Sequence, residues 1–181
     1  MYVLVVESLG FLTLVALAMG TVLGVSALLP GERFPERLVS EVPGGAIRVA
    51  FIAALVATLG SLYLSEIVGF VPCELCWFQR IAMYPLVIVL GVAALRGDLE
   101  VWRTALPISA IGAAISAYHI VVQRAPNLEV TECSGAVPCS AIYVTVWGFV
   151  SIPVMAGGVF VLVSAIMIAL ARRSGDGASE A

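Results

Sequence analysis

Five long apolar segments, each almost free of charge, decide what this chain can fold into. They run over residues 9–29, 49–65 (with an extension toward residue 70), 81–95, 104–123 and 144–170. An α-helix needs about 20 residues to cross the roughly 30 Å hydrocarbon layer of a bilayer, so each segment can form one span. The alternation of apolar and polar residues that is typical of membrane β-barrels is not seen. The sequence therefore predicts an all-α membrane protein with five transmembrane helices.

The composition agrees with a protein that resides in the lipid bilayer. Of the 181 residues, 61% are hydrophobic and 12% are charged, whereas an average soluble domain is ~45–50% apolar and ~25% charged. All nine basic residues are arginines, spread along the chain, and the net charge is −3. Because these arginines form no basic patch, we expect no nucleic-acid partner.

The placement of the arginines predicts the orientation of the chain. Seven arginines lie at one end of the predicted spans, and two lie at the other end. The group of seven is Arg33, Arg37, Arg48, Arg96, Arg103, Arg172 and Arg173. The group of two is Arg80 and Arg124. Arginines are enriched on the cytoplasmic side of membrane proteins, so we expect the first group and the C-terminus in the cytoplasm. The cysteine-bearing segments 71–76 and 126–140, and the N-terminus, then face outward from the cytoplasmic membrane.

The first span has alternative interpretations. It could be a secretory signal peptide, but such a peptide needs a positively charged start, and the only early charge is Glu7. Gly20 and Gly24 have the small-xxx-small spacing that allows helices to pack closely. Glycine is also common in membrane helices in general, and we take this as the default explanation for the pair.

Four cysteines are the reactive groups of this chain, and they form two pairs. Cys73 and Cys76 make a CxxC motif, and five residues separate Cys133 from Cys139. A CxxC pair can alternate between dithiol and disulfide, and a place in the first turn of a helix favours the thiolate. Cys76 is expected at the start of the third span, with Arg80 one turn deeper on the same face. A guanidinium at that place favours the thiolate of Cys76.

The residues alone leave other interpretations open. The cysteines could form two structural disulfides, or all four could bind zinc, because C-x2-C recurs in zinc sites. An oxidising exterior works against retained thiolates, so we expect no metal ion. An arginine at the end of a span, such as Arg80, can also simply extend its charge to the interface.

The cysteines lie within motifs that resemble the disulfide-bond formation protein B (DsbB) family, particularly its short BdbC-like branch. The motifs are PCELCWFQR at 72–80, MYP at 83–85, YH at 118–119, Gln123, CSG at 133–135, VPC at 137–139, WGF at 147–149 and IP at 152–153. The resemblance covers about residues 47–170. It implies a four-helix bundle that passes electrons from a thioredoxin-like, DsbA-like dithiol oxidase outside the membrane to a membrane quinone, either ubiquinone or menaquinone.

The resemblance also implies a role for each matching residue. Cys133 is attacked by the partner's thiolate and Cys139 is released, after which Cys139 exchanges with Cys73. Cys76 lies nearest the membrane and forms an adduct or charge-transfer complex with the quinone. Arg80 supports that thiolate and donates to a quinone carbonyl. Each step before the quinone is thiol–disulfide exchange through a mixed disulfide.

His119 and Gln123 are candidates for the quinone site as well. They lie one turn apart in the fourth span and share a helix face. Polar groups inside a bilayer often mark a site, so the pair could contact the quinone head. Hydrogen bonds between helices near the outer interface explain the pair equally well.

The chain departs from the family pattern in two places. The span before residue 30 is extra, and the second cysteine pair is closer together than in the longer members. We therefore expect an extra N-terminal transmembrane helix (1–30), a cytoplasmic linker (31–46), a DsbB-like redox domain (47–171) and a cytoplasmic tail (172–181).

Two other functions are also compatible with cysteine pairs in a membrane protein. A membrane scaffold or transporter subunit could carry structural disulfides, but a transporter is expected to show inverted repeats, and no repeat is seen. A vitamin K epoxide reductase-like enzyme also couples cysteine pairs to a quinone. That family places its loop pair before its CxxC motif, which is the reverse of the order here.

Overall fold

The computed structural model describes residues 2–28, 43–128 and 137–179. Its long helices are α1 (Tyr2–Leu28), α3 (Pro43–Leu62), α4 (Glu74–Arg96), α5 (Trp102–Arg124) and α6 (Ile152–Ser179). All five are long and apolar enough to cross a membrane. Across these described ranges the other regular elements are short: a π-helix η1 (Tyr63–Ile67), two 3-10 helices, η2 (Leu99–Val101) and η3 (Pro126–Leu128), and one isolated bridge. The prediction of an all-α membrane protein with five spans is confirmed.

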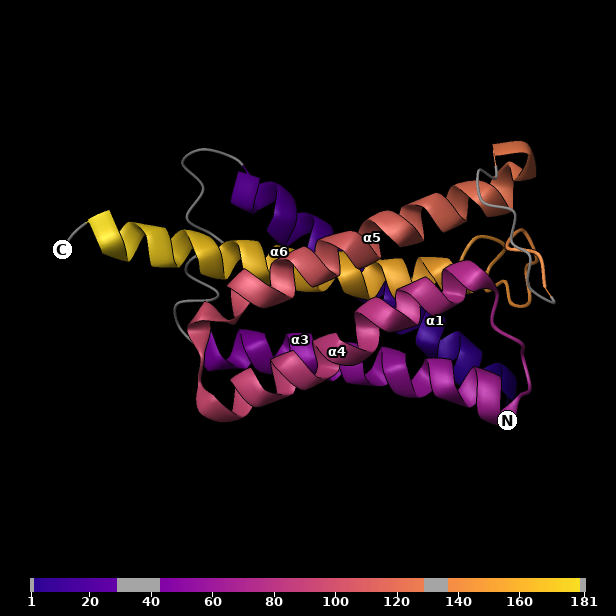
Figure 1. Cartoon of the computed structure of the whole chain (residues 1–181), viewed down its shortest axis with the longest axis horizontal. Coiled ribbons are helices and arrows are strands. Elements are labelled where there is room, and N and C mark those ends of the chain that lie inside the picture. Colours follow the sequence, from indigo (N-terminus) through magenta and orange to yellow (C-terminus); the bar gives the residue numbers. More distant parts are fainter. Residues whose placement is uncertain (1, 29–42, 129–136, 180–181) are drawn as a thin grey trace.

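The helices run back and forth along one long axis, with α6 in the middle (Figure 1). The α6 helix is the most buried of the five. In its apolar 18-residue stretch 61% of the residues are buried, against 28% to 39% in the corresponding stretches of the other four helices. The α3, α4, α5 and α6 helices form a four-helix bundle, because α3 packs on α4, α4 on α5, and α6 on both α5 and α3. The α1 helix packs mainly on α6, outside that bundle.

Close contact between α1 and α6 depends on glycine. A Cβ atom at Gly20 would lie 2.9 Å from the backbone N and Cα atoms of Leu162. On the facing helix, a Cβ atom at Gly158 would lie 3.0 Å from Thr13 Cγ2. The expectation that Gly20 merely reflects the general frequency of glycine in membrane helices is therefore wrong, since only glycine allows this approach.

The α4 helix begins at Glu74, so Cys76 lies in its first turn as expected. Three other helices begin at residues different from those that the charge-free segments predict. The α1 helix begins at Tyr2 rather than at residue 9, and α3 begins at Pro43 rather than at residue 49. Charged residues are tolerated in these first turns, where a helix leaves the hydrocarbon layer. The α6 helix begins at Ile152 rather than at residue 144. The chain before it turns through Trp147 (φ 50°) and Gly148 (φ 78°), and Val146 and Val150 exchange backbone hydrogen bonds across this turn.

The turn before α6 brings residues 137–151 back over the same end of the bundle at which α4 begins (Figure 1). The cysteine-bearing segments that the structure describes, the start of α4 and the chain around Cys139, are thus at one end of the helices. The α6 helix runs from there to the opposite end.

Candidate functional site

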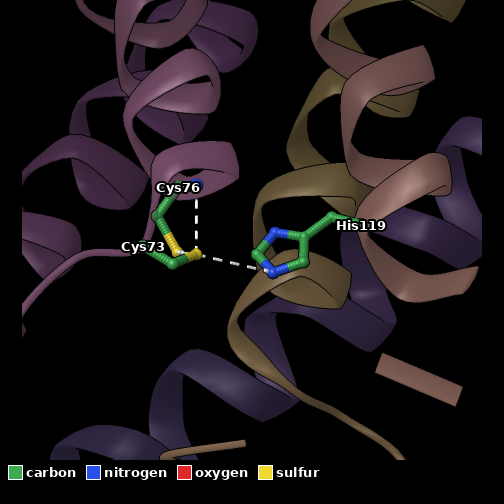
Figure 2. Close-up of side chains that lie close together, drawn as sticks. All are labelled: Cys73, Cys76 and His119. Atoms are coloured by element: carbon green, nitrogen blue, oxygen red, sulfur yellow. Dashed lines mark hydrogen bonds between the residues drawn. The ribbon is translucent and has the colours of Figure 1, made fainter. Parts of the chain in front are cut away.

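The CxxC motif forms the first turn of α4. Cys73 is the N-cap residue, with an extended backbone (φ −72°, ψ 170°), and its Sγ accepts a hydrogen bond from the Cys76 backbone N–H at 3.4 Å. The two sulfur atoms are 2.6 Å apart, and both cysteines are free thiols. An N-cap side chain normally satisfies one of the free N–H groups at a helix start, and here a sulfur does so. Figure 2 shows both sulfurs on the side of the turn that faces His119.

His119 connects α5 to both cysteine-bearing segments. Its Nε2 atom lies 3.7 Å from Cys73 Sγ (Figure 2). The same atom lies 3.1 Å from the Cys139 carbonyl oxygen, and the Nδ1 atom lies 3.3 Å from Gln79 Nε2. The Gln79 amide can only donate through Nε2, so Nδ1 accepts and the ring proton resides on Nε2. That N–H points to the Cys139 carbonyl, which can only accept. His119 is 1% exposed, so these contacts fix its orientation.

The same contacts make Cys73 acidic. The hydrogen bond from the Cys76 thiol is the main cause that lowers the pKa of Cys73 well below its usual range, and burial opposes it. The hydrogen bond with His119 and the backbone N–H of Cys76 act in the same direction as the thiol. The spacing predicts the favoured thiolate at Cys76, whereas the hydrogen bonds that Cys73 receives favour the thiolate of Cys73.

Cys139 lies beside this pair. It is disulfide-bonded and fully buried, and it forms one apolar cluster with Cys73, Leu75 and Val122. Cys133, the other expected catalytic cysteine of the loop, lies outside the described residues. The structure thus brings Cys73, Cys76 and Cys139 together, as the resemblance requires.

Gln123 fastens the chain around Cys139 to α5. Its side-chain N–H donates to the Ala141 carbonyl at 3.4 Å, and its Oε1 atom accepts from the Ser151 hydroxyl at 2.7 Å. His119 and Gln123 therefore form the hydrogen bonds between segments that the sequence analysis names as one of two explanations. They line a small cavity of about 10 Å³ together with Cys73 and Cys76.

A much larger cavity, of about 340 Å³, lies on the other side of Cys76. Residues of α1, α3, η1, α4 and α6 line it, together with Tyr143 and residues 70–72. Its polar lining, which includes Cys76, Gln79, Arg80 and Ser61, gathers at the end where α4 begins. Elsewhere its walls are apolar except for Thr13, whose hydroxyl donates to the Leu9 carbonyl of its own helix. Cys76, Tyr143 and Ile152 line both cavities and so separate Cys73 and His119 from the larger one.

Arg80 is anchored at the wall of this cavity. Its Nε donates to the Ser61 hydroxyl and its Nη2 donates to the Ser61 carbonyl, both at 3.0 Å. Its guanidinium also lies 5.3 Å from the centre of the Trp77 ring. The chain of α3 changes to the π-helix η1 just after Ser61, and a π-helical turn is often found at a functional site. Arg80 and Cys76 thus border one apolar space, as their spacing predicts.

Gln79 and Ser61 also belong to the site, although neither is a candidate from the sequence. Gln79 is 4% exposed, orients His119 and also lines the large cavity. A polar residue one turn after the CxxC motif was the available signal for Gln79. Nothing in the sequence indicates that Ser61 meets Arg80, because that contact depends on how α3 packs against α4.

The ligand atoms of Cys73, Cys76 and His119 lie within 4.8 Å of one another. The two sulfur atoms are in direct contact, and a CxxC pair can alternate between a dithiol and a disulfide. The cluster can therefore carry thiol–disulfide chemistry.

A bundle of transmembrane helices with a dithiol at the start of one span, and a disulfide-bonded cysteine packed against it, defines a membrane protein of thiol–disulfide chemistry. The comparison with family models agrees: residues 45–170 match the model described as disulfide bond formation protein DsbB. The chain belongs to this family. Its α1 helix precedes the matched region.

Similar proteins carry names of the same kind. The chain is 47% identical over 122 residues to "Disulfide bond formation protein C" of Bacillus subtilis, covering 67% of this chain and 88% of that protein. It is 44% identical over 127 residues to a "Probable disulfide formation protein" of Oceanobacillus iheyensis (69% and 88%), and 36% identical over 128 residues to one of Metapseudomonas resinovorans (70% and 89%). No solved structure gives a significant match. The chain is thus a membrane oxidoreductase of a family that supports disulfide formation.

Proposed function

We propose that this protein is a thiol–quinone oxidoreductase. It reoxidises a thioredoxin-like, DsbA-like dithiol oxidase on the outer side of the membrane and passes the electrons to a membrane quinone, ubiquinone or menaquinone. The observation that carries the proposal is the position of Cys76. This residue touches Cys73 on one side and lines an apolar cavity beside Arg80 on the other.

The cavity has the chemistry that a quinone requires. A quinone has a polar head with two carbonyl oxygens and a long apolar tail. The cavity offers hydrogen-bond donors at one end and apolar walls elsewhere. Its volume of about 340 Å³ is within the usual range for small-molecule sites, about 300–1,000 Å³. Arg80 and Cys76 are the residues that we assign to the head.

Electrons would move through the cysteines in the order of their positions. The partner's thiolate attacks Cys133 of an oxidised Cys133–Cys139 pair, and Cys139 leaves as a thiolate. Cys139 attacks the sulfur of Cys73 in an oxidised Cys73–Cys76 pair, and Cys76 leaves as a thiolate. The second partner thiol then breaks the partner–Cys133 bond, which gives the partner disulfide and frees Cys133. Cys133 attacks Cys139 and releases Cys73, so the Cys133–Cys139 disulfide is restored and Cys73 and Cys76 are left as a dithiol that holds the two electrons. In sum, one partner dithiol becomes a disulfide, and two electrons and two protons reduce one quinone to quinol.

His119 and Gln123 would serve the exchange between the two cysteine pairs. His119 lies between Cys73 and the Cys139 carbonyl, so its ring can hold a proton beside the Cys73 sulfur, which is attacked in one exchange and leaves in the other. Gln123 holds the chain after Cys139 against α5. Neither residue is in the lining of the large cavity. The proposal therefore needs no direct contact between either residue and the quinone.

The arginine distribution supports the sidedness of this scheme. The cysteine-bearing end of the helices would face outward and the C-terminus would be cytoplasmic, because seven of the nine arginines belong to the other end. Disulfides persist outside the cytoplasm, where a dithiol oxidase works. Residues 47–171 would be the redox domain, with 1–30, 31–46 and 172–181 as extra helix, cytoplasmic linker and cytoplasmic tail.

A single-turnover assay tests the proposal without a partner. The fully reduced protein has four thiols, which hold the electrons for two quinone molecules. Mixing it with excess quinone under anaerobic conditions should consume two equivalents of quinone per chain. Cys76→Ser should consume none, while its four-helix core stays folded by circular dichroism. A reduced wild-type protein that leaves the quinone unchanged would show that the cysteines are not coupled to it.

A further inference from the structure

The large cavity is longer than a quinone head. From Ser61, which binds Arg80, to Val49 near the other end of the lining, α3 advances about 18 Å at 1.5 Å per residue. Beyond the polar end, its lining consists of apolar side chains such as Val56, Ile52 and Leu162. A single ring with two carbonyl oxygens accounts for one end of this space and leaves the apolar length unexplained.

One wall of the cavity comes from a helix outside the family match. Leu12, Ala16 and Met19 of α1 line it, and α1 ends before residue 45, where the match begins. The glycine contacts at Gly20 and Gly158 hold α1 tightly against α6. The α1 helix has far less contact with α3, where Leu9 lies beside Gly60. Beyond that contact the two helices stand apart along the cavity.

The gap between α1 and α3 opens the cavity sideways. Met19 on α1 is 41% exposed and Ile52 on α3 is 55% exposed, although both line the cavity. In a membrane such exposed apolar side chains face lipid rather than water. An apolar chain can therefore pass between α1 and α3 while a polar head remains at Arg80 and Cys76.

We propose that α1 forms the lipid-side wall of the quinone site and that the gap between α1 and α3 holds the isoprenoid tail of the quinone. The α1 helix would thus add tail recognition to a head site built from the four-helix bundle. This inference rests on the proposed function, because the tail belongs to the quinone that Cys76 reduces. It assigns Met19 and Ile52 as positioning residues, which contact the tail and not the reacting atoms.

Two matched pairs of variants test the tail site in the full-length protein. Met19→Trp and Ile52→Trp place a bulky ring at the cavity from opposite walls. Val22→Trp and Leu59→Trp are the controls, since Val22 (58% exposed) and Leu59 (56% exposed) lie on the same two helices but outside the lining. The substrates are one benzoquinone ring without a side chain and the same ring carrying several isoprene units, with a chemical dithiol as electron donor.

The ratio of the two KM values is the measurement. Met19→Trp and Ile52→Trp should raise KM for the long-tailed quinone by about tenfold, a loss of about 1.4 kcal/mol. Turnover of the tail-free ring by the same variants shows that they are folded, and Val22→Trp and Leu59→Trp should leave both KM values unchanged. An unchanged ratio in both variants, or an equal change in the controls, overturns the tail site while the proposed function stands. A wild-type protein that reduces neither quinone overturns the proposed function and the tail site with it.

Discussion

Substitution of Arg80 separates a role in quinone reduction from a role in anchoring two helices. Arg80 donates two hydrogen bonds of 3.0 Å to Ser61 and lies over the Trp77 ring. A guanidinium has five N–H donors, so Ser61 leaves up to three for a carbonyl oxygen in the cavity. Loss of one preorganised donor to a developing negative charge costs about 10²–10³-fold in turnover. We therefore expect Arg80→Ala to lower kcat/KM for quinone by about 100-fold.

The anchoring role predicts a different set of changes. A hydrogen bond from a charged donor contributes about 1.5–3 kcal/mol, so Arg80→Ala also costs stability at the start of α4. Ser61→Ala removes one of those bonds but keeps the guanidinium, and it should change quinone kinetics by less than about threefold. Arg80→Lys keeps the charge without the planar fork and should recover only part of the lost turnover.

The assay measures quinone reduction and, separately, the rate at which the reduced partner loses its thiols in a single turnover. Arg80→Ala should slow the first measurement and leave the second unchanged, because the cysteine of the loop still accepts electrons. Normal quinone kinetics in Arg80→Ala, with a loss of thermal stability like that of Ser61→Ala, would refute the reasoning. Arg80 would then only anchor α4 to α3.

Three further outcomes are expected. The alkylation rate of Cys73 should stay near its plateau as the pH falls from about 8 to about 6, because an acidic thiol is already ionised there. The alkylation rate of an ordinary thiol falls about tenfold per pH unit over this range, and such a fall for Cys73 would contradict its lowered pKa. Gly112→Ala should lower the free energy of unfolding by about 1–3 kcal/mol, since a Cβ would overlap the Phe160 ring. Gly44→Ala is the control, because Gly44 has open space around it, and an equal loss of unfolding free energy in both variants would contradict this packing. A membrane-impermeant thiol reagent should label Cys73, Cys76 or the loop pair (Cys133 and Cys139) in reduced intact cells, and labelling that requires an opened cytoplasmic side would reverse the orientation.

The number and type of helices could be predicted from the sequence because they depend on local properties. A run of about 20 apolar residues in a bilayer has few alternatives to a helix. The helix ends were less predictable. Glu74 lies inside α4 and Glu7 inside α1, so charge marks the membrane interface rather than the end of the helix. The turn at Trp147 and Gly148 has the composition of a span and yet is not helical.

The candidate site was predictable only in part. The CxxC spacing identifies Cys73 and Cys76, and helix periodicity brings Arg80 near Cys76. The contacts of His119 with Cys73 and the Cys139 carbonyl join segments that are distant in the sequence, so they depend on how the helices pack. The wall that α1 adds to the cavity depends on packing in the same way. No local pattern in α1 distinguishes a cavity wall from a helix that faces lipid on all sides.

The central claim is that electrons pass from an external dithiol to a membrane quinone through this protein. The direct measurement follows both substrates at once, under anaerobic conditions, with the protein in liposomes and a reduced CxxC oxidase outside them. The account predicts continuous turnover with one quinone reduced for each partner dithiol oxidised, and no turnover in Cys76→Ser. Oxidation of the partner without loss of quinone, or quinone loss that persists in Cys76→Ser, would contradict it.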